Sequence, residues 1–253
     1  LTAWGFESPL PHHHQGTPMS HTTVRGIISA GLLSLCACST TPEIPPGEDP
    51  LEWQEKVETF EAEALDSPPP PDAALFIGSS SIRRWDTLHE DMAPLPVIKR
   101  GFGGSRLFDS VYWADRLVVA HDPAVIVMFS GTNDIKGKTP KSPEQVRALF
   151  KQFVHRVRDG ECDAPIVYIA INPSKKRIEH LDRVLETNRQ ICAHCESDDS
   201  LYFVDTASAL LDDWGQPDMR WFDEDELHLN AAGYALWTER IKPLVTRLLA
   251  LTP

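Results

Sequence analysis

The chain is short of positive charge, and this shortage narrows the partners that it can have. Its 253 residues contain 24 Lys and Arg against 37 Asp and Glu, which gives a formal net charge of −13. A nucleic-acid partner is therefore not expected, because no excess of cations is present to neutralise phosphates. The same balance argues against a basic membrane-binding patch. An acidic surface of this kind is explained by solvation alone.

Cysteine is also scarce, with five residues in the chain. Cys192, His194 and Cys195 fall within one helical turn, but a zinc site needs about four ligands at suitable spacing. We therefore expect thiols on a helix, partly buried, and no metal or cofactor is implied. A disulfide from Cys162 to either partner stays open, since export makes one permissible.

No apolar run near the N-terminus is long enough to span a membrane. Gly26–Ala37 is apolar and small, about the length of a signal-peptide core, whereas a spanning helix needs roughly 20 such residues. The run ends in Leu35-Cys36-Ala37-Cys38, which resembles a bacterial lipoprotein signal. That resemblance implies acylation of Cys38. An ordinary signal peptide with two incidental cysteines is the alternative.

The order of these segments predicts four parts of the chain. Residues 1–18 contain three adjacent histidines and lie before Met19, where we place the true start. Residues 19–38 form the lipoprotein signal, and residues 39–50, rich in Pro, Thr and acids, form a tether. Residues 51–253 form the domain. We expect an exported lipoprotein of the cell envelope that contacts the membrane through its lipid only.

The domain alternates apolar strands with amphipathic helices. Continuous apolar strands of this kind form a parallel sheet that helices cover on both faces. The predicted strands are 73–78, 96–100, 124–129, 165–171 and 201–204. The predicted helices are 51–66, 105–120, 142–158, 178–195 and 230–250.

Polar and glycine-rich segments follow the first three strands and precede the last helix. They are Gly78-Ser79-Ser80-Ser81, Gly101-Phe102-Gly103-Gly104, Gly131-Thr132-Asn133-Asp134 and Asp223-Glu224-Asp225-Glu226-Leu227-His228. Parallel sheets bind ligands at the carboxyl ends of their strands. A serine, a carboxylate and a histidine would therefore meet there with glycine backbone and an amide, which are the groups that acyl transfer needs.

These four segments resemble the sequence blocks of the SGNH/GDSL hydrolases, including esterases similar to platelet-activating-factor acetylhydrolase. The resemblance covers roughly residues 51–250. It implies a three-layer α/β/α sandwich with a five-stranded parallel sheet, the flavodoxin-like fold of that family. It also implies a triad of Ser80, Asp225 and His228, and an oxyanion hole formed by the backbone of Ser80 and Gly104 with the Asn133 amide. Ser79 stands where the family usually has Asp.

Several alternatives stay open beside this interpretation. Ser79 or Ser81 could be the nucleophile, although turn and cap hydroxyls explain them better. Gly101–Gly104 is only half a dinucleotide fingerprint, and residues 131–139 only approximate a phosphate-binding loop. Asp134 is expected to anchor its loop.

The expected activity is hydrolysis of short-chain acyl or acetyl esters through a serine acyl-enzyme. One alternative is removal of acetyl groups from polysaccharides. Another is an exported protein that binds a lipid or glycan without turnover. Small-molecule or glycan esters are the expected partners, and the oligomeric state is not indicated by the sequence.

Overall fold

The computed structural model describes residues 41–251. The segments predicted as upstream sequence (1–18) and lipoprotein signal (19–38), with Cys38, lie outside these residues. No helix in the described range is both long enough and apolar enough to cross a membrane.

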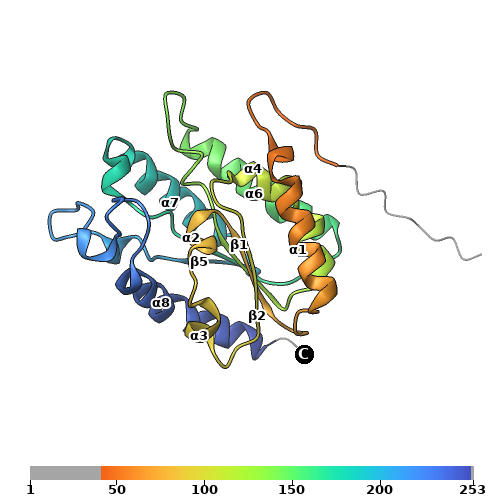
Figure 1. Cartoon of the computed structure of the whole chain (residues 1–253). Helices are drawn as coiled ribbons and strands as arrows, with labels where there is room; N and C mark the ends of the chain where they lie inside the picture. The colour runs from red at the N-terminus through yellow and green to blue at the C-terminus, as the bar shows by residue number, and fades with distance from the viewer. Residues whose placement is uncertain (1–40, 252–253) are drawn as a thin grey trace, which may run out of the picture. The chain divides into compact units, whose positions relative to one another are not determined.

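Five parallel strands form a single sheet with helices on both sides (Figure 1). Their order in the sheet is β2-β1-β3-β4-β5. Every predicted strand is present within two residues of its expected bounds, which confirms the predicted parallel sheet. The strands are β1 (Ala74–Gly78), β2 (Val97–Gly101), β3 (Val125–Phe129), β4 (Ile166–Ile169) and β5 (Leu201–Val204).

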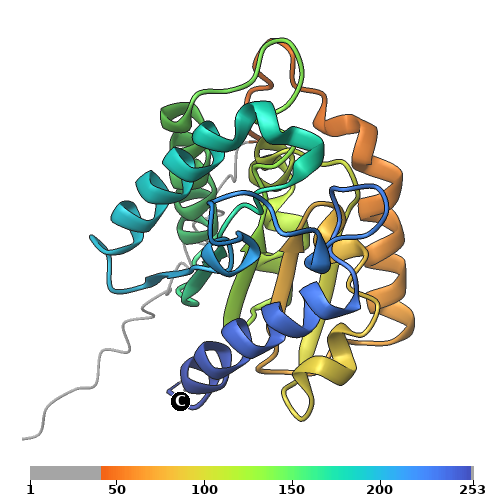
Figure 2. The same cartoon turned by 90° about the vertical axis from the view of Figure 1, so that its left-hand side faces the viewer.

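The helices divide between the two faces of the sheet. One face carries α1 (Gln54–Asp66), α4 (Leu107–Tyr112), α5 (Ala114–Leu117), α6 (Pro143–Asp159) and α7 (Leu181–Cys195). The other carries α2 (Ser80–Arg83), α3 (Leu88–Met92) and α8 (Ala231–Leu249). Figure 2 shows α8 crossing its face of the sheet. Short 3-10 turns complete the chain at Pro50–Trp53, Val119–His121, Lys175–His180, Ser208–Leu210 and Met219–Trp221.

Each strand contributes side chains to two separate apolar cores, because successive residues of a strand point to opposite faces. In β1, Leu75 and Ile77 belong to the core beneath α1 and α4. Ala74 and Phe76 belong to the core beneath α8. This arrangement explains why the strands contain almost no polar residue.

The single helix predicted over residues 105–120 is wrong. The chain forms α4, α5 and a 3-10 turn instead, and α4 is separated from α5 at Trp113, whose ψ of 7° is not helical. The Trp113 indole is buried and its Nε1 donates to the Pro50 carbonyl, 2.8 Å away. Tertiary packing therefore overrides the helical periodicity of this stretch.

Contacts with the domain begin inside the segment predicted as a tether. The Gly47 carbonyl accepts a hydrogen bond from Arg106 Nη1 at 3.1 Å. The Glu48 side chain is almost fully buried and pairs with Lys141 at 2.6 Å and with Arg106 at 3.4 Å. The folded part of the chain therefore starts at about residue 47, a few residues before its predicted boundary.

Candidate active site

The predicted site segments meet at the carboxyl edge of the sheet. Ser80 follows β1, Gly104 follows β2 and Asn133 follows β3. Asp225 and His228 lie in the loop before α8. Residues that are up to 148 positions apart in the chain are thus in direct contact.

Ser80 is the first residue of α2, directly after the turn that ends β1. Gly78 makes this turn with a φ of +142°, and a β-carbon there would lie 1.9 Å from the Phe129 carbonyl oxygen. Only glycine therefore lets the chain pass β3 and present Ser80. As the first helical residue, Ser80 has no intrahelical acceptor for its backbone N–H.

Ser80, His228 and Asp225 form one hydrogen-bonded line. Ser80 Oγ lies 2.8 Å from His228 Nε2, and His228 Nδ1 lies 2.6 Å from Asp225 Oδ2. A carboxylate can only accept, so Nδ1 carries the proton in the neutral ring and Nε2 is left to accept from the serine hydroxyl.

The neighbouring serines do not share this contact. Ser79 is 1% exposed and its hydroxyl has no partner among the described residues. Ser81 is 5% exposed, and its carbonyl accepts from the Tyr234 hydroxyl at 2.8 Å. Of the three consecutive serines, Ser80 alone contacts His228.

Asp225 is held in place by its own loop. Its Oδ1 accepts from the backbone N–H of Leu227 at 3.0 Å and of His228 at 2.9 Å. Partial burial alone would raise the pKa of this carboxyl, but the hydrogen bonds from His228 and Leu227 outweigh burial and lower the pKa to about 2. Arg84 is the residue directly after α2, and its Nη1 lies 3.4 Å from Asp225 Oδ2. Asp225 is therefore charged throughout the neutral range.

Asn133 connects the second and third blocks of the site. The side chain is 7% exposed, and its Nδ2 donates to the Ser105 carbonyl at 2.9 Å. Gly104 precedes Ser105 with a φ of +98°, a backbone conformation that favours glycine. Asn133 thus lines the pocket with Ser80 and His228, and Gly104 lies on the loop that Asn133 contacts.

Asp134 anchors the third block, as its position predicts. Its buried carboxylate accepts from the Leu107 N–H at 2.9 Å and pairs with Lys141 at 3.1 Å. Burial raises the pKa of the carboxyl, and Lys141 opposes this shift. Asp134 is turned away from Ser80 toward α4, which explains a structural role.

The pocket at the triad is small, with a volume of about 10 Å³. Phe129 and Leu227 are the only strongly apolar side chains on its wall. The remaining lining residues are polar: Ser79, Ser80, Ser81, Thr132, Asn133, Asn172, Arg177 and His228.

Asn172 and Arg177 were not identified from the sequence as site residues. Both come from the loop between β4 and α7, which the alternation of strands and helices places at the same edge of the sheet. The position of the loop was therefore predictable, whereas the direction of each side chain depends on an irregular turn. Arg177 has φ −130° and ψ 34° inside a 3-10 segment.

The three cysteines of the described residues are free thiols. Burial raises the pKa of Cys195 to about 12, so this thiol is neutral. Within residues 41–251, no group of three or more His, Cys, Asp and Glu side chains is arranged to hold a metal ion.

The fold and the site together define a class of α/β protein. In this class a parallel sheet in the order 2-1-3-4-5 carries a serine, a histidine and an aspartate in hydrogen-bonded sequence at its carboxyl edge. Residues 73–236 match the profile of the GDSL-like Lipase/Acylhydrolase family. The chain therefore belongs to this family and is a hydrolase. Among curated proteins, none matches the chain.

Solved structures share this fold at low sequence identity. A candidate platelet activating factor from Streptococcus pneumonia is 22% identical with a TM-score of 0.66, over 77% of this chain and 94% of that one. A GDSL-like lipase from Bacteroides thetaiotaomicron is 17% identical with a TM-score of 0.66, over 76% and 97%. A carbohydrate esterase family 3 protein from Talaromyces cellulolyticus is 13% identical with a TM-score of 0.57, over 70% and 98%.

Proposed function

We propose that the protein is a serine esterase that hydrolyses short acyl esters, acetyl esters above all. The observation that carries the proposal is the line from Ser80 Oγ through His228 to Asp225, with distances of 2.8 and 2.6 Å. These distances lie within the range at which a base takes a hydroxyl proton.

In the proposed mechanism, His228 removes the Ser80 proton as the hydroxyl attacks the ester carbonyl. Asp225 keeps the imidazole in the required tautomer and stabilises the imidazolium that forms. The protonated His228 then gives its proton to the leaving alcohol, and an acyl-Ser80 remains. Water then gives a proton to His228 and attacks this acyl group. As the bond to Ser80 breaks, His228 returns the proton to Ser80 Oγ, and the carboxylic acid is released.

The oxyanion of each tetrahedral intermediate would be stabilised by three donors. These are the backbone N–H groups of Ser80 and Gly104 and the side-chain amide of Asn133. Loss of one such donor typically lowers turnover by about 10²–10³-fold. We therefore expect Asn133→Ala to fall within that range.

A fluorophosphonate probe tests the nucleophile directly. The wild-type protein should be labelled and should hydrolyse p-nitrophenyl acetate, while Ser80→Ala should do neither. Ser79→Ala and Ser81→Ala are the matched controls and should retain labelling. Labelling that persists in Ser80→Ala, or absence of hydrolysis by the folded wild type, would contradict the proposal. The second result would favour a binding protein without turnover.

Deacetylation of polysaccharides is the second candidate activity. The observation that favours it is the polar wall of the pocket, to which Thr132, Asn133 and Asn172 contribute. Sugar hydroxyls form hydrogen bonds with hydroxyl and amide side chains of this kind. O-acetylated xylan oligomers compared with nitrophenyl esters of two to eight carbons would separate the candidates: higher kcat/KM on the glycans supports deacetylation.

We further propose that the protein is exported and anchored to the cell envelope by acylation of Cys38. The lipoprotein-like sequence Leu35–Cys38 supports this proposal. Expression of the full precursor in bacteria with a radiolabelled fatty acid should label the wild type and not Cys38→Ala. The variant should move from the membrane fraction to the soluble fraction. Equal labelling of both proteins would contradict it.

A further inference from the structure

The loop between β4 and α7 contacts both halves of the candidate active site. Near its start, Ile171 is fixed to α7 by two hydrogen bonds with the Asn188 side chain, at 2.8 and 2.9 Å. Farther along, the loop reaches the block that contains Asn133 and the block that contains Asp225 and His228. The residue that makes the first of these contacts is Arg177.

Arg177 holds two consecutive residues of the third block. Its Nη1 donates to the Thr132 carbonyl, and its Nη2 donates to Asn133 Oδ1 at 3.2 Å. No ion pair joins Arg177 to a carboxylate among the residues that the structure describes. Burial lowers the pKa of this guanidinium, which nevertheless stays charged because an arginine in a protein does not lose its proton. The side chain is half-buried in the wall of the triad pocket.

The contacts of Asn133 leave one orientation for its carboxamide. Arg177 can only donate, so the atom that it meets must be the carbonyl oxygen of the amide. The Ser105 carbonyl can only accept, so the atom 2.9 Å from it must be the amide nitrogen. A flipped amide would place its NH2 group against the Arg177 guanidinium and its oxygen against the Ser105 carbonyl, so that donor would face donor and acceptor would face acceptor. One N–H of Asn133 therefore remains available for an oxyanion.

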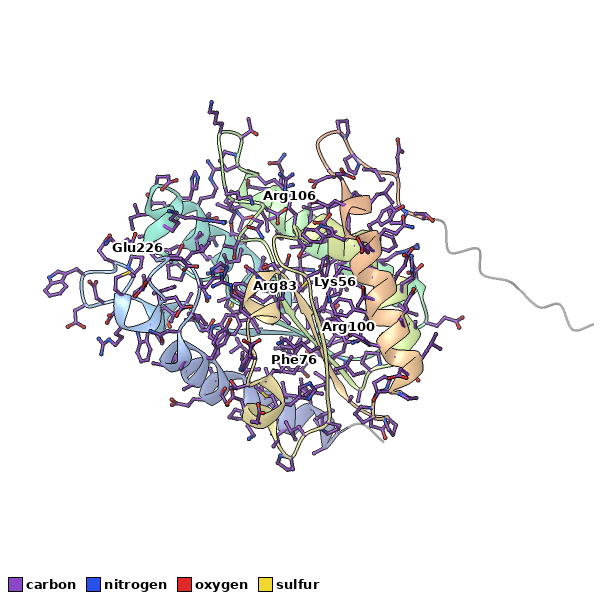
Figure 3. All side chains as sticks on the ribbon, viewed as in Figure 1. Lys56, Phe76, Arg83, Arg100, Arg106 and Glu226 are labelled. Carbon is purple, nitrogen blue, oxygen red and sulfur yellow. The ribbon has the colours of Figure 1, made fainter. Side chains whose placement is uncertain are left out.

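The same loop is attached to the block of Asp225 and His228 through Glu226. Lys175 Nζ pairs with the Glu226 carboxylate at 2.7 Å, and the backbone N–H of Lys176 donates to the Glu226 carbonyl at 3.0 Å. Glu226 lies beside the segment that precedes α7 (Figure 3) and directly follows Asp225. The loop thus links the block that contains Asn133 to the block that contains Asp225 and His228.

We propose that Arg177 is a positioning residue that fixes the Asn133 amide in the orientation able to donate to the oxyanion. This role rests on the proposed esterase function. Two donor nitrogens of the guanidinium are already engaged by Thr132 and Asn133, which favours positioning over direct recognition of an anionic substrate. The charge beside Oδ1 also polarises the amide and strengthens its N–H as a donor.

The test compares Arg177→Met, Arg177→Lys and Lys176→Met on p-nitrophenyl acetate. Arg177→Met removes both hydrogen bonds, and we expect kcat to fall about 10- to 100-fold while KM changes less than about threefold, since an oxyanion donor acts mainly in the transition state. Arg177→Lys keeps a charge but presents its donors from one nitrogen and not from the two of the planar guanidinium, so it should recover only part of kcat. Lys176→Met removes an exposed cation from the same loop and should leave kcat within twofold.

Two further measurements separate positioning from a loss of folding. In the double variant Arg177→Met/Asn133→Ala, kcat should equal that of Asn133→Ala alone, because both changes remove the same donor. Added guanidinium should raise kcat of an Arg177→Ala variant and not that of Asn133→Ala. Unchanged kcat in Arg177→Met, a loss confined to KM, or losses that multiply in the double variant would overturn the proposal. In each of these cases wild-type turnover and Ser80 labelling remain, so the esterase function is judged separately.

Discussion

The indole of Trp53 lies against Gly104. Its Cη2 atom is 3.5 Å from the position that a β-carbon of residue 104 would occupy. Trp53 precedes the region that matches the family profile, which begins at residue 73. A segment outside the matched region therefore supports the loop of the proposed oxyanion glycine.

Substitution of Trp53 should affect both stability and turnover. The indole packs edge-on against Phe102, with centroids 5.7 Å apart, and its Nε1 donates to Asp109 at 3.1 Å. We expect Trp53→Ala to lower the free energy of unfolding by about 3 kcal/mol, since removal of a large buried ring typically costs about 3–5 kcal/mol and this one is only partly buried. We also expect kcat to fall, since the Gly104 loop loses its support. Urea unfolding and p-nitrophenyl acetate kinetics would measure the two effects.

Trp214 provides the matched control for this substitution. It is 83% exposed, so Trp214→Ala should change the unfolding free energy by less than about 0.5 kcal/mol and leave kcat unchanged. If Trp53→Ala and Trp214→Ala had the same unfolding free energy and the same kcat, Trp53 would not support the site.

Asp225→Asn should reduce kcat by about 10³–10⁴-fold, because an amide can donate to His228 Nδ1 and stabilise the wrong tautomer. The lowered pKa of Asp225, about 2, fixes the pH dependence of this loss. A carboxyl of lowered pKa stabilises the fold above its unfolded pKa, near 3.8, and this contribution disappears only as pH falls through about 2. The wild-type carboxylate therefore stays charged from pH 6 to pH 9, and kcat of the variant should lie below that of the wild type throughout this range in stopped assays.

Asp223→Asn is the control for charge alone. Asp223 is half-exposed and lies 3.9 Å from Arg84, the same cation that approaches Asp225. It makes no side-chain contact with His228, so we expect kcat within about twofold of the wild type. A loss as large as that of Asp225→Asn would assign the effect to the charge of the loop and not to the imidazole tautomer.

The sequence predicts the parts of the site that depend on topology. A parallel sheet gathers the carboxyl ends of its strands, so the segments after β1, β2 and β3 had to lie together. The offset of three residues between Asp225 and His228 likewise fits a single loop. Four of the five strands were predictable because their apolar runs are continuous, whereas β2 contains Lys99 and Arg100.

Other features depend on contacts that no local pattern encodes. Arg177 reaches Asn133 from an irregular turn, and Glu48 pairs with Lys141 from a segment whose composition is typical of a tether. The four-residue helix that begins at Ser80 is too short to have a periodicity. Trp113 interrupts a stretch that is otherwise helical because its indole binds the Pro50 carbonyl.

Lys141→Met should destabilise the protein strongly at neutral pH. Burial alone would lower the pKa of Lys141, but Asp134 and Glu48 outweigh it and raise the pKa. Removal of the cation leaves the buried Asp134 carboxylate without a cationic partner, while Glu48 keeps only Arg106, and loss of one partner of a buried ion pair typically costs about 3–5 kcal/mol. The loss should shrink as pH falls, because burial raises the pKa of the Asp134 carboxyl and the carboxyl takes up a proton. Thermal unfolding of the wild type and of Lys141→Met between pH 4.5 and pH 8 would show whether their stabilities approach each other at low pH.

Lys138→Met is the control for Lys141→Met, since it removes an exposed cation from the same loop. We expect its unfolding curve to match that of the wild type at every pH. A pH-independent loss in Lys141→Met would mean that the aliphatic part of the side chain, and not its charge, supports the loop.

Asp109→Asn should stabilise the protein at neutral pH. Burial raises the pKa of this carboxyl to about 7, against hydrogen bonds from Arg106 and Trp53 that lower it, and nearby acids add to the rise. The folded state therefore holds a proton that the unfolded state releases near pH 4, and stability falls as pH rises from about 4 to about 7.

The hydrogen bonds from Arg106 and Trp53 both reach the same oxygen of Asp109, Oδ2, and an asparagine Oδ1 can accept both. The pKa rises from 3.8 to about 7, and one pKa unit corresponds to about 1.4 kcal/mol, so the gain at pH 8 should be on the order of 4 kcal/mol. Urea unfolding at pH 4 and pH 8 would measure it, with the exposed Asp163→Asn as control; a variant less stable than the wild type at pH 8 would show that the Asp109 carboxylate is well accommodated.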